Sequence, residues 1–393
     1  MYSFMQVLLC KRGDLDMGVV MELDLKMDRR TSIMPLVSVI VPCFNRSSTI
    51  QRAIESVLDQ TYSNIEIIVV DDGSTDDTID LLRKLYSGND KIIVYSKQEN
   101  GGVACARNVG IKRARGKYIS FLDSDDEWKI EHLSEAVDAL EATGYGVFMA
   151  MWEIELDGET YGVEDTDGGE EYFNSTVECL NAKKSEDYYL FEDGIYEFSV
   201  LEQFYFFHIN TLVVSYELLY ECGGFNESYK TSEDTELLLR LLERERKMIF
   251  SKKHHFIYHQ SEDGIYSFMS NKGIDISNVR IQSNTIKKKI FEINEAKVKI
   301  RKRCKKQIDV CKVAYFKRGE YIARIDNYIF KKLIYMEYIC GSSMRFNRLL
   351  YALRALHYCH KTDEMGFVIK LLIDIMSGRN RSEDEYLPYM NYW

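Results

Sequence analysis

Apolar runs and helical periodicity alternate through the first third of the chain. Four nearly continuous apolar runs lie at residues 36–41, 65–70, 91–96 and 117–122. Between them, apolar residues recur at helical spacing, for example at Ile50, Ile54 and Val57. Buried strands that alternate with amphipathic helices are typical of a largely parallel sheet covered on both faces. The pattern therefore predicts an α/β fold of Rossmann-like type.

Polar loops follow three of these predicted strands. They span Pro42–Arg46, Asp71–Asp76 and Asp123–Asp126. In open α/β sheets, ligands bind outside the carboxyl ends of the strands. We therefore expect the three loops to converge on one crevice.

The third loop contains three carboxylates in four positions, Asp123, Asp125 and Asp126. Hard divalent cations prefer several oxygen ligands in a small space, so this cluster is a candidate metal site. An acidic turn that ends a strand and caps the next helix would have the same composition. Both interpretations stay open on these residues alone.

Beyond the cluster, the pattern predicts a helix at 130–142 and strands at 145–152 and 207–215. An acidic and aromatic segment at 153–206, with no clear periodicity, separates the two strands. Its aromatic residues suit either stacking on a ligand or packing within hairpins. A further helix opens at Ser232, with Glu233 and Asp234 in its first turn, where acids complement the helix dipole.

From residue 279 to 377 the pattern is almost entirely helical and locally basic. Lys287–Lys306 holds 10 basic and 2 acidic residues, whereas Glu153–Glu197 holds 15 acids and 2 lysines. A basic amphipathic helix suits an anionic membrane surface or a partner, including a second copy of the chain, or is a solvated face. We predict an extension at 1–33, an α/β domain at 34–270 with an acceptor-side insertion at 153–206, and a helical region at 271–393.

Composition narrows the functional class. A net charge of −11 disfavours a nucleic-acid partner. The nine cysteines contain no Cys-x-x-Cys pair, which indicates reduced thiols and not a zinc site or disulfide framework. No apolar run is long enough for a transmembrane helix, and the first residues lack signal-peptide order. These features predict a cytoplasmic protein.

Seven short motifs occur in a characteristic order. They are VSVIVPCFN (37–45), SVLDQTY (56–62), VVDDGSTD (69–76), ENGGVACARNVG (99–110), DSDDEW (123–128), GGFNE (223–227) and SED (232–234). Together they make residues 37–259 resemble a family 2 glycosyltransferase of GT-A fold, of the kind that assembles bacterial polysaccharides such as O-antigen and capsule.

The resemblance implies roles for individual residues. The donor nucleotide would be bound by Pro42, Phe44, Asn45, Asp72, Arg107, Asn108 and Ser124. A divalent cation, Mn²⁺ or Mg²⁺, would be held by Asp123, Asp125 and Asp126, with His259 as a further candidate. Asp234 would be the catalytic base, with Glu233 as the alternative. Phe44 and Asp72 also fit a packing and a turn-forming role, respectively.

The implied activity is an inverting, metal-dependent transfer of a hexose or N-acetylhexosamine. The donor would be a UDP-sugar, and the acceptor a glycan or lipid-linked glycan at the inner face of the membrane. A nucleotidyltransferase or a dehydrogenase is disfavoured because the loop after the first strand has no glycine-rich phosphate motif. The non-enzymatic alternative is a carbohydrate-binding or scaffold protein on the same fold.

Overall fold

The computed structural model describes residues 34–156, 158–165, 169–185, 187–192, 194–202, 206–259, 284–307, 318–340, 345–359, 362–379, 381–382 and 385–389. Pro35–Trp393 forms one compact unit. The predicted extension at 1–33 and the predicted domain boundary at residue 270 lie outside the described residues.

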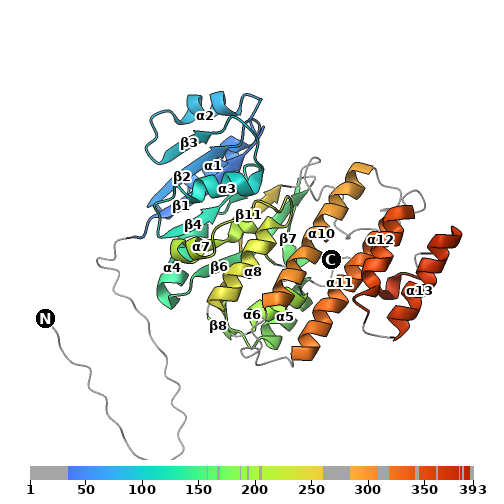
Figure 1. Ribbon diagram of the computed structural model, residues 1–393. Helices are drawn as coiled ribbons and strands as arrows, with labels where there is room; N and C mark the ends of the chain where they lie inside the picture. Colours follow the sequence, from blue (N-terminus) through green and yellow to red (C-terminus); the bar gives the residue numbers. More distant parts are fainter. Residues whose placement is uncertain are drawn as a thin grey trace, which may run out of the picture. The chain divides into compact units, whose positions relative to one another are not determined.

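Strands and helices alternate in the first part of the chain (Figure 1). The elements are β1 (Val37–Cys43), α1 (Ile50–Leu58), β2 (Ile65–Asp71), α2 (Thr78–Tyr86), β3 (Ile92–Ser96), α3 (Val103–Ile111) and β4 (Tyr118–Phe121). The four strands pair in parallel in the order β3-β2-β1-β4. The predicted α/β class is confirmed, and the carboxyl ends of these strands share one edge.

Both faces of the parallel strands are covered, as β2 shows. Ile67 and Val69 pack into the main hydrophobic core, whereas Ile68 and Val70 pack on the opposite face with Ala106 of α3. All four strand residues are fully buried. Since successive strand side chains point to opposite faces, burial on both explains the continuous apolar run.

A glycine lets α3 approach β1 closely. A Cβ atom at Gly110 would lie 2.5 Å from the side chain of Ile40, too close for any other residue without movement. The contact fixes α3 against the sheet. It thereby fixes the position of Arg107, one turn earlier on the same helix.

The sheet continues beyond β4 as a mixed one, in the order β4-β10-β6-β11-β9-β8. Strand β10 is antiparallel to both β4 and β6. The elements are β5 (Glu127–Trp128), α4 (His132–Thr143), β6 (Val147–Leu156), β7 (Glu159–Gly162), η1 (Val163–Asp165), α5 (Gly169–Cys179), β8 (Lys183–Lys184), β9 (Tyr188–Phe191), α6 (Ile195–Glu202), η2 (Ile209–Thr211), β10 (Val213–Ser215), α7 (Tyr216–Glu221), α8 (Glu233–Glu245) and β11 (Met248–His259).

The strand predicted at 207–215 is shorter than expected. Only Val213–Ser215 is a strand, and Ile209–Thr211 forms a 3₁₀ turn. Side chains take the backbone groups that a strand ladder would use. The Asn210 N–H donates to His208 Nδ1 at 3.3 Å, and the Trp128 indole N–H donates to the Asn210 carbonyl at 2.7 Å.

Where it is described, the acidic segment 153–206 forms short strands and the helices α5 and α6, and aromatic residues that it buries pack on one another. The Phe173 ring centroid lies 5.3 Å from that of Tyr189 and 5.5 Å from those of Phe206 and Phe250. Phe173 and Phe206 are fully buried. For these rings the structure supports the packing alternative, not sugar stacking.

Helices make up the C-terminal region, as expected. They are α10 (Asn284–Gln307), α11 (Arg318–Cys340), α12 (Arg345–Leu356) and α13 (Thr362–Ser377), and each packs on the next (Figure 1). Arg301 of α10 donates to the Val200 carbonyl of α6 at 3.0 Å, and Arg303 lies 3.6 Å from Glu236 of α8. No described helix is long and apolar enough to cross a membrane.

Candidate active site

Asp123 and Asp125 lie immediately after β4, at the carboxyl edge of the sheet. Their side chains are 27% and 30% exposed. Asp125 Oδ2 lies 3.2 Å from a guanidinium nitrogen of Arg46, on the loop after β1. Burial, and next the negative charge of Asp123, raise the pKa of Asp125. The two carboxylates therefore repel each other, and a cation beside them would relieve that repulsion.

Asp126 is in a different environment from its two neighbours. It is 1% exposed, and it accepts hydrogen bonds from the Asn210 amide at 2.6 Å and from the His259 backbone N–H at 2.9 Å. Burial raises its pKa well above the ordinary value. Both oxygens are used inside the protein, so the contacts favour a role in holding the turn against β11.

His259, at the end of β11, lies between two carboxylates. Its Nδ1 is 3.1 Å from Glu155 and its Nε2 is 3.3 Å from Glu127. Within the described ranges, no group of three or more His, Cys, Asp or Glu side chains is arranged to hold a metal ion. The contacts of His259 are with these glutamates and, through its backbone N–H, with Asp126.

A cation fits this site only if the ligand supplies part of its coordination. Mg²⁺ in particular is commonly bound by one or two carboxylates together with substrate phosphates and water. Asp123 and Asp125 are such a pair, since both are partly exposed. An all-protein metal site does not fit, because Asp126 is already bonded and the described part of the chain gathers no larger group of ligands.

Arg107 of α3 links Asp123, one of the two candidate metal ligands, to the start of α8. It is 3% exposed and donates to Asp123 at 2.7 Å and to Glu233 at 2.8 Å. Burial alone would lower the pKa of the guanidinium, but the carboxylates of Asp123 and Glu233 outweigh it and raise the pKa. Arg107 was expected to contact the donor, and the structure shows it as a buried link between carboxylates.

Glu233 and Asp234 open α8 but differ in surroundings. Glu233 is 8% exposed, and burial followed by the Asp234 charge raises its pKa to about 7. Asp234 is only partly buried, its Oδ1 accepts the Thr235 N–H at 2.6 Å, and within the described residues it makes no ion pair. The carboxylate that remains available is that of Asp234.

His208 also lies within the electrostatic reach of this site. Burial lowers its pKa to about 4, while the charges of Asp123 and Asp234 both act to raise it. Its Nδ1 accepts from the Asn210 N–H, so the neutral ring carries its proton on Nε2. The sequence contained no signal for this residue, because a single histidine in an expected strand has no distinguishing neighbours.

Asn210 is the second residue that the sequence did not reveal. Its amide oxygen accepts the Asp123 backbone N–H at 3.0 Å, and its amide nitrogen donates to Asp126 at 2.6 Å. It is fully buried. Asn210 thus holds two of the three acids of the turn in place.

On the donor side, the loop after β1 is built as a platform. Pro42 is buried within β1, whereas Phe44 is 40% exposed. Asn45 has a left-handed backbone (φ 54°), and its side-chain oxygen accepts the Thr75 N–H at 2.8 Å. That bond ties the loop to the one after β2, and the exposed Phe44 ring suits base stacking.

Asp72 is bonded internally. It is 3% exposed and accepts from Lys97 Nζ at 2.5 Å and from the backbone N–H groups of Gly101 and Gly102 at 3.0 and 2.7 Å. Successive backbone N–H groups of this kind form an anion-binding nest. In this structure, then, the Asp72 carboxylate holds the loop at 97–102, and its expected contact with the nucleotide base remains a prediction.

Asn108 and Ser124 complete the expected donor set. The Asn108 side chain makes two hydrogen bonds with the Phe225 backbone. Its oxygen accepts from the N–H at 2.8 Å, and its nitrogen donates to the carbonyl at 2.9 Å. Ser124 is buried. These contacts favour positioning of the loop at 223–227 by Asn108.

Several known proteins resemble this chain in sequence. The profile described as Glycosyl transferase family 2 matches residues 38–202. Over 157 residues the chain is 39% identical to a putative teichuronic acid biosynthesis glycosyltransferase of Bacillus subtilis, covering 38% of this chain and 62% of the relative. Over 130 residues it is 42% identical to the Escherichia coli UDP-Glc:alpha-D-GlcNAc-diphosphoundecaprenol beta-1,3-glucosyltransferase, covering 33% and 51%. The chain thus spans 51% to 62% of the length of these two relatives.

Solved structures show the same fold. A mannosyltransferase from Pyrobaculum calidifontis, in complex with GDP-Man and Mn²⁺, has a TM-score of 0.51 at 16% identity, covering 88% of each chain. S. aureus TarS 1–349, in complex with UDP-GlcNAc, has a TM-score of 0.50 at 18% identity, covering 88% of this chain and 93% of TarS 1–349. The expected GT-A fold is confirmed.

Proposed function

Residues 38–202 of this chain belong to glycosyl transferase family 2, and from this premise we propose that the protein is an inverting, metal-dependent glycosyltransferase. Its donor is a nucleotide sugar, for which UDP is the preferred nucleotide. Its acceptor is a glycan or lipid-linked glycan in surface polysaccharide synthesis. The names of two relatives support this choice: one is a putative glycosyltransferase of teichuronic acid biosynthesis, and the other transfers glucose from UDP-Glc to GlcNAc-diphosphoundecaprenol.

The observation that carries the proposal is the buried bridge Asp123–Arg107–Glu233. It connects the carboxyl end of β4 to the first turn of α8. Donor-side acids and a candidate base therefore occupy one rigid arrangement. Reactions between two bound substrates gain most from such fixed geometry.

On the donor side, Phe44 offers an exposed ring for the base, and Asp123 and Asp125 would hold a divalent cation. When bound, such a cation stabilises the charge that develops on the departing nucleoside diphosphate. Arg46, 3.2 Å from Asp125, adds a positive charge on the same side. Asp126 and Asn210 keep the turn in shape.

On the acceptor side, Asp234 accepts the proton of the attacking hydroxyl group. The C–O bond to the acceptor forms as the bond to the diphosphate breaks, on opposite faces of the anomeric carbon, which inverts its configuration. Glu233 is held by Arg107 at 2.8 Å and keeps that guanidinium in place. We therefore assign the base to Asp234 and a positioning role to Glu233.

The proposal is tested by UDP release from a panel of UDP-sugars with Mn²⁺ or Mg²⁺. We expect one donor to give turnover, chelation by EDTA to remove it, and Asp125→Ala to abolish it. A thermal-shift panel measures donor binding separately, because a ligand of the folded state raises the melting temperature. Binding without turnover in the presence of acceptor would favour the carbohydrate-binding or scaffold alternative.

We further propose that the enzyme contacts the inner face of the membrane through α13. Met365, Ile369, Ile373 and Met376 recur at helical spacing and are 44% to 69% exposed. Such an apolar stripe suits the interface of a bilayer. Ile369→Asp/Ile373→Asp should reduce co-sedimentation with liposomes. If sedimentation is unchanged and the oligomeric state falls instead, the stripe joins two copies of the chain.

A further inference from the structure

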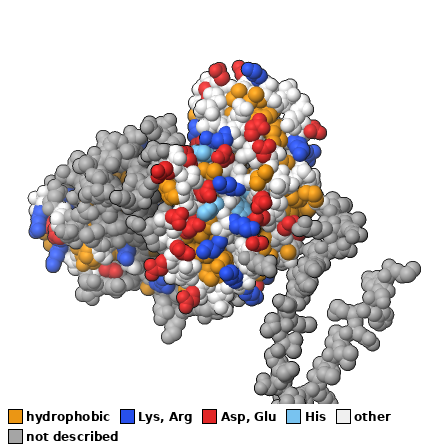
Figure 2. Space-filling model, turned by 180° about the vertical axis from the view of Figure 1, so that it is seen from behind, with side chains coloured by type: hydrophobic (Ala, Val, Ile, Leu, Met, Phe, Trp, Pro, Cys, Tyr) orange, Lys and Arg blue, Asp and Glu red, His pale blue; other side chains and the backbone are white. Residues whose placement is uncertain are grey.

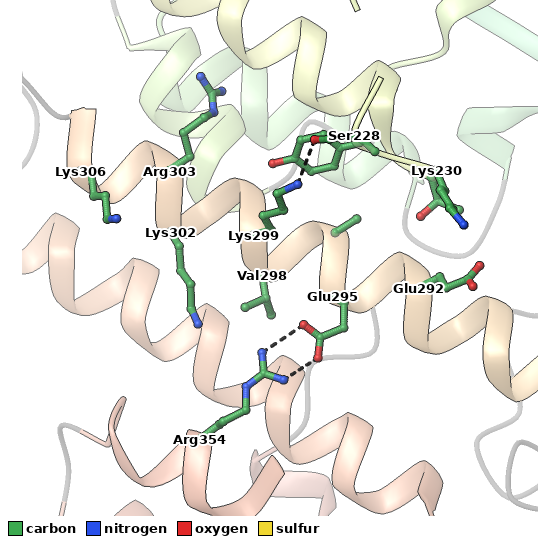
Figure 3. Close-up of a pocket in the computed structure, with 13 residues that line it drawn as sticks. Ser228, Lys230, Glu292, Glu295, Val298, Lys299, Lys302, Arg303, Lys306 and Arg354 are labelled. Carbon is green, nitrogen blue, oxygen red and sulfur yellow. Dashed lines mark hydrogen bonds and ion pairs between the residues drawn. The ribbon is translucent and has the colours of Figure 1, made fainter. Parts of the chain in front are cut away.

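A basic pocket lies beside the proposed base. It has a volume of about 660 Å³ and is lined by the loop before α8, by one face of α10 and by Arg354 of α12. Figure 3 shows Lys299, Lys302 and Lys306 in succession along α10, with Ser228 and Lys230 on the loop. None of the residues assigned to the donor or to the base lines it.

Basic side chains outnumber acidic ones in the lining of the pocket. Two arginines in its lining are paired with carboxylates. Arg354 forms a bidentate ion pair with Glu295 at 2.5 and 3.0 Å, and Arg303 lies 3.6 Å from both Glu236 and Glu243. The other acid of the lining, Glu292, is 4.0 Å from Lys288, which is outside the pocket.

Four lysines of the lining have no such partner. Among the described residues, Lys230, Lys299, Lys302 and Lys306 form no ion pair with a carboxylate. Lys230, Lys299 and Lys306 are exposed, and Lys302 is partly buried. On the face seen in Figure 2, by contrast, acidic and basic side chains are interspersed. A surplus of uncompensated ammonium groups around one cavity, in a chain of net charge −11, favours an anionic ligand.

Contacts between α10 and the loop before α8 fix the position of the pocket relative to the proposed base, Asp234. Lys299 Nζ donates to Ser228 Oγ at 3.1 Å and lies 4.0 Å from the centre of the Tyr229 ring. The chain then runs from Thr231, in the pocket wall, to Asp234 in three residues, which spans at most about 11 Å. A group bound in the pocket is therefore within the length of a short oligosaccharide of the attacking hydroxyl.

We propose that this pocket binds the phosphate or diphosphate group of the acceptor. The inference rests on the proposed function and specifies its acceptor class, a glycan carrying phosphate or diphosphate near the sugar to be extended. Lysine ammonium groups bind phosphate as point charges and make no planar pair, so several lysines around one cavity suit a multiply charged, tetrahedral group. The sugar attached to that group would present its hydroxyl to Asp234.

Binding of inorganic pyrophosphate, measured by isothermal titration calorimetry on the full chain in EDTA, tests the proposal. The test variant is Lys302→Ala/Lys306→Ala. The matched control is Lys287→Ala/Lys289→Ala, which removes the same charge from the same helix outside the pocket and keeps Lys288, the partner of Glu292. We expect the test variant to bind pyrophosphate at least about tenfold more weakly, a loss of about 1.4 kcal/mol, and the control to bind as the wild type does. Equal affinity of all three proteins would overturn the proposal.

Phosphate groups could also come from a membrane surface, and a second arm separates the two sources. The same proteins are sedimented with vesicles of phosphatidylglycerol and of phosphatidylcholine. If the test variant loses vesicle binding but keeps its pyrophosphate affinity, the pocket faces lipid headgroups and the acceptor proposal is overturned. With a diphosphate-linked acceptor, the test variant should raise KM at least tenfold while kcat changes little.

The result is separable from the proposed function. Pyrophosphate binding needs no donor and no turnover. A chain that releases no UDP but binds pyrophosphate in this pocket would contradict the transferase proposal alone. An active transferase with equal pyrophosphate affinity in all variants would contradict the pocket proposal alone.

Discussion

Asp123 and Glu233 share one guanidinium group, because Arg107 donates to both, at 2.7 and 2.8 Å. Glu233 is almost fully buried, so its charge depends on this pair. Removing one partner of a buried ion pair leaves an uncompensated charge, which commonly costs about 3 to 5 kcal/mol. The bridge therefore stabilises the fold at the point where the site is assembled.

Arg107→Met should lower the free energy of unfolding at pH 7.5 by about 3 kcal/mol. Urea titration followed by circular dichroism measures it. Lys112→Met, at an exposed position directly after the same helix, is the control and should stay within about 0.5 kcal/mol of the wild type. If both variants unfold alike, Glu233 does not depend on the guanidinium for its stability.

Asp234→Asn should lower kcat by about 10² to 10⁴, the usual range for a lost general base. Donor affinity should hardly change, because the residue faces the acceptor in the proposed mechanism. Glu233→Gln should lose less, since a Gln oxygen can still accept from Arg107. Single-turnover kinetics and donor titration together distinguish them. The reverse order of effects would make Glu233 the base.

Acid should destabilise the protein through a buried pair of histidines. His132 Nδ1 and His255 Nδ1 lie 3.0 Å apart, at 1% and 2% exposure. Burial, and then the charge of His255, lower the pKa of His132, and burial lowers that of His255. Below about pH 6.5 the unfolded chain binds protons that the folded chain does not. The stabilising contribution is thus present above that pH and falls by up to about 1.4 kcal/mol per pH unit for each ring.

Urea unfolding of the wild type at pH 7.5, 6.5 and 5.5 measures this slope. His132→Asn keeps a polar group opposite His255 but cannot titrate in this range, so its stability should depend less on pH. Glu135, 3.4 Å from His255, opposes the shift at that ring, which is why His132 is the better position to change. An unchanged slope in His132→Asn would assign the acid sensitivity to other groups.

Lys332→Met should stabilise the protein. Lys332 of α11 is fully buried, its Nζ has no hydrogen-bond partner in the described part of the chain, and it lies near Lys297 and Arg301. Burial lowers its pKa well below the ordinary value. An apolar side chain of similar length removes the cost of burying an ammonium group, about 1 kcal/mol or more.

Lys331→Met is the matched control, because Lys331 is partly exposed, and it should change stability by less than about 0.5 kcal/mol. Thermal unfolding of the three proteins at one pH gives the comparison. A lower melting temperature for Lys332→Met would contradict this prediction, because it would show that the Lys332 side chain stabilises the folded protein.

The parallel half of the fold was predictable because its signals are local. Continuous apolar runs such as Ile65–Val70 are produced by burial on both faces, and polar loops after them meet at one edge for geometric reasons. Convergence of Asp123 with the loops after β1 and β2 follows from parallel order alone. No knowledge of individual side-chain contacts was needed for it.

The hydrogen-bond partners of the polar side chains in the site were not predictable from the sequence. Asn210 binds the turn at Asp123 and Asp126 through contacts between segments distant in sequence, and its own region looked like a plain strand. Asp72 and Asn108 occupy the expected loops, but local N–H groups and the Phe225 backbone take up their polar atoms. Residue type and loop position are therefore recoverable from sequence, whereas the direction of each polar group is not.

Helix α10 has a practical consequence for how the C-terminal region can be studied. Arg301 bonds to the end of α6, and Arg303 lies beside two acids of α8, so the helix is part of the catalytic body. Cutting the chain near residue 280 would remove α10 with its fully buried Ile300, and would leave Glu236, at 1% exposure, without one of its two arginines. A truncated chain would lose activity and membrane binding together through partial unfolding. The roles of the C-terminal helices should therefore be tested by point substitutions on α11, α12 and α13, with α10 left in place.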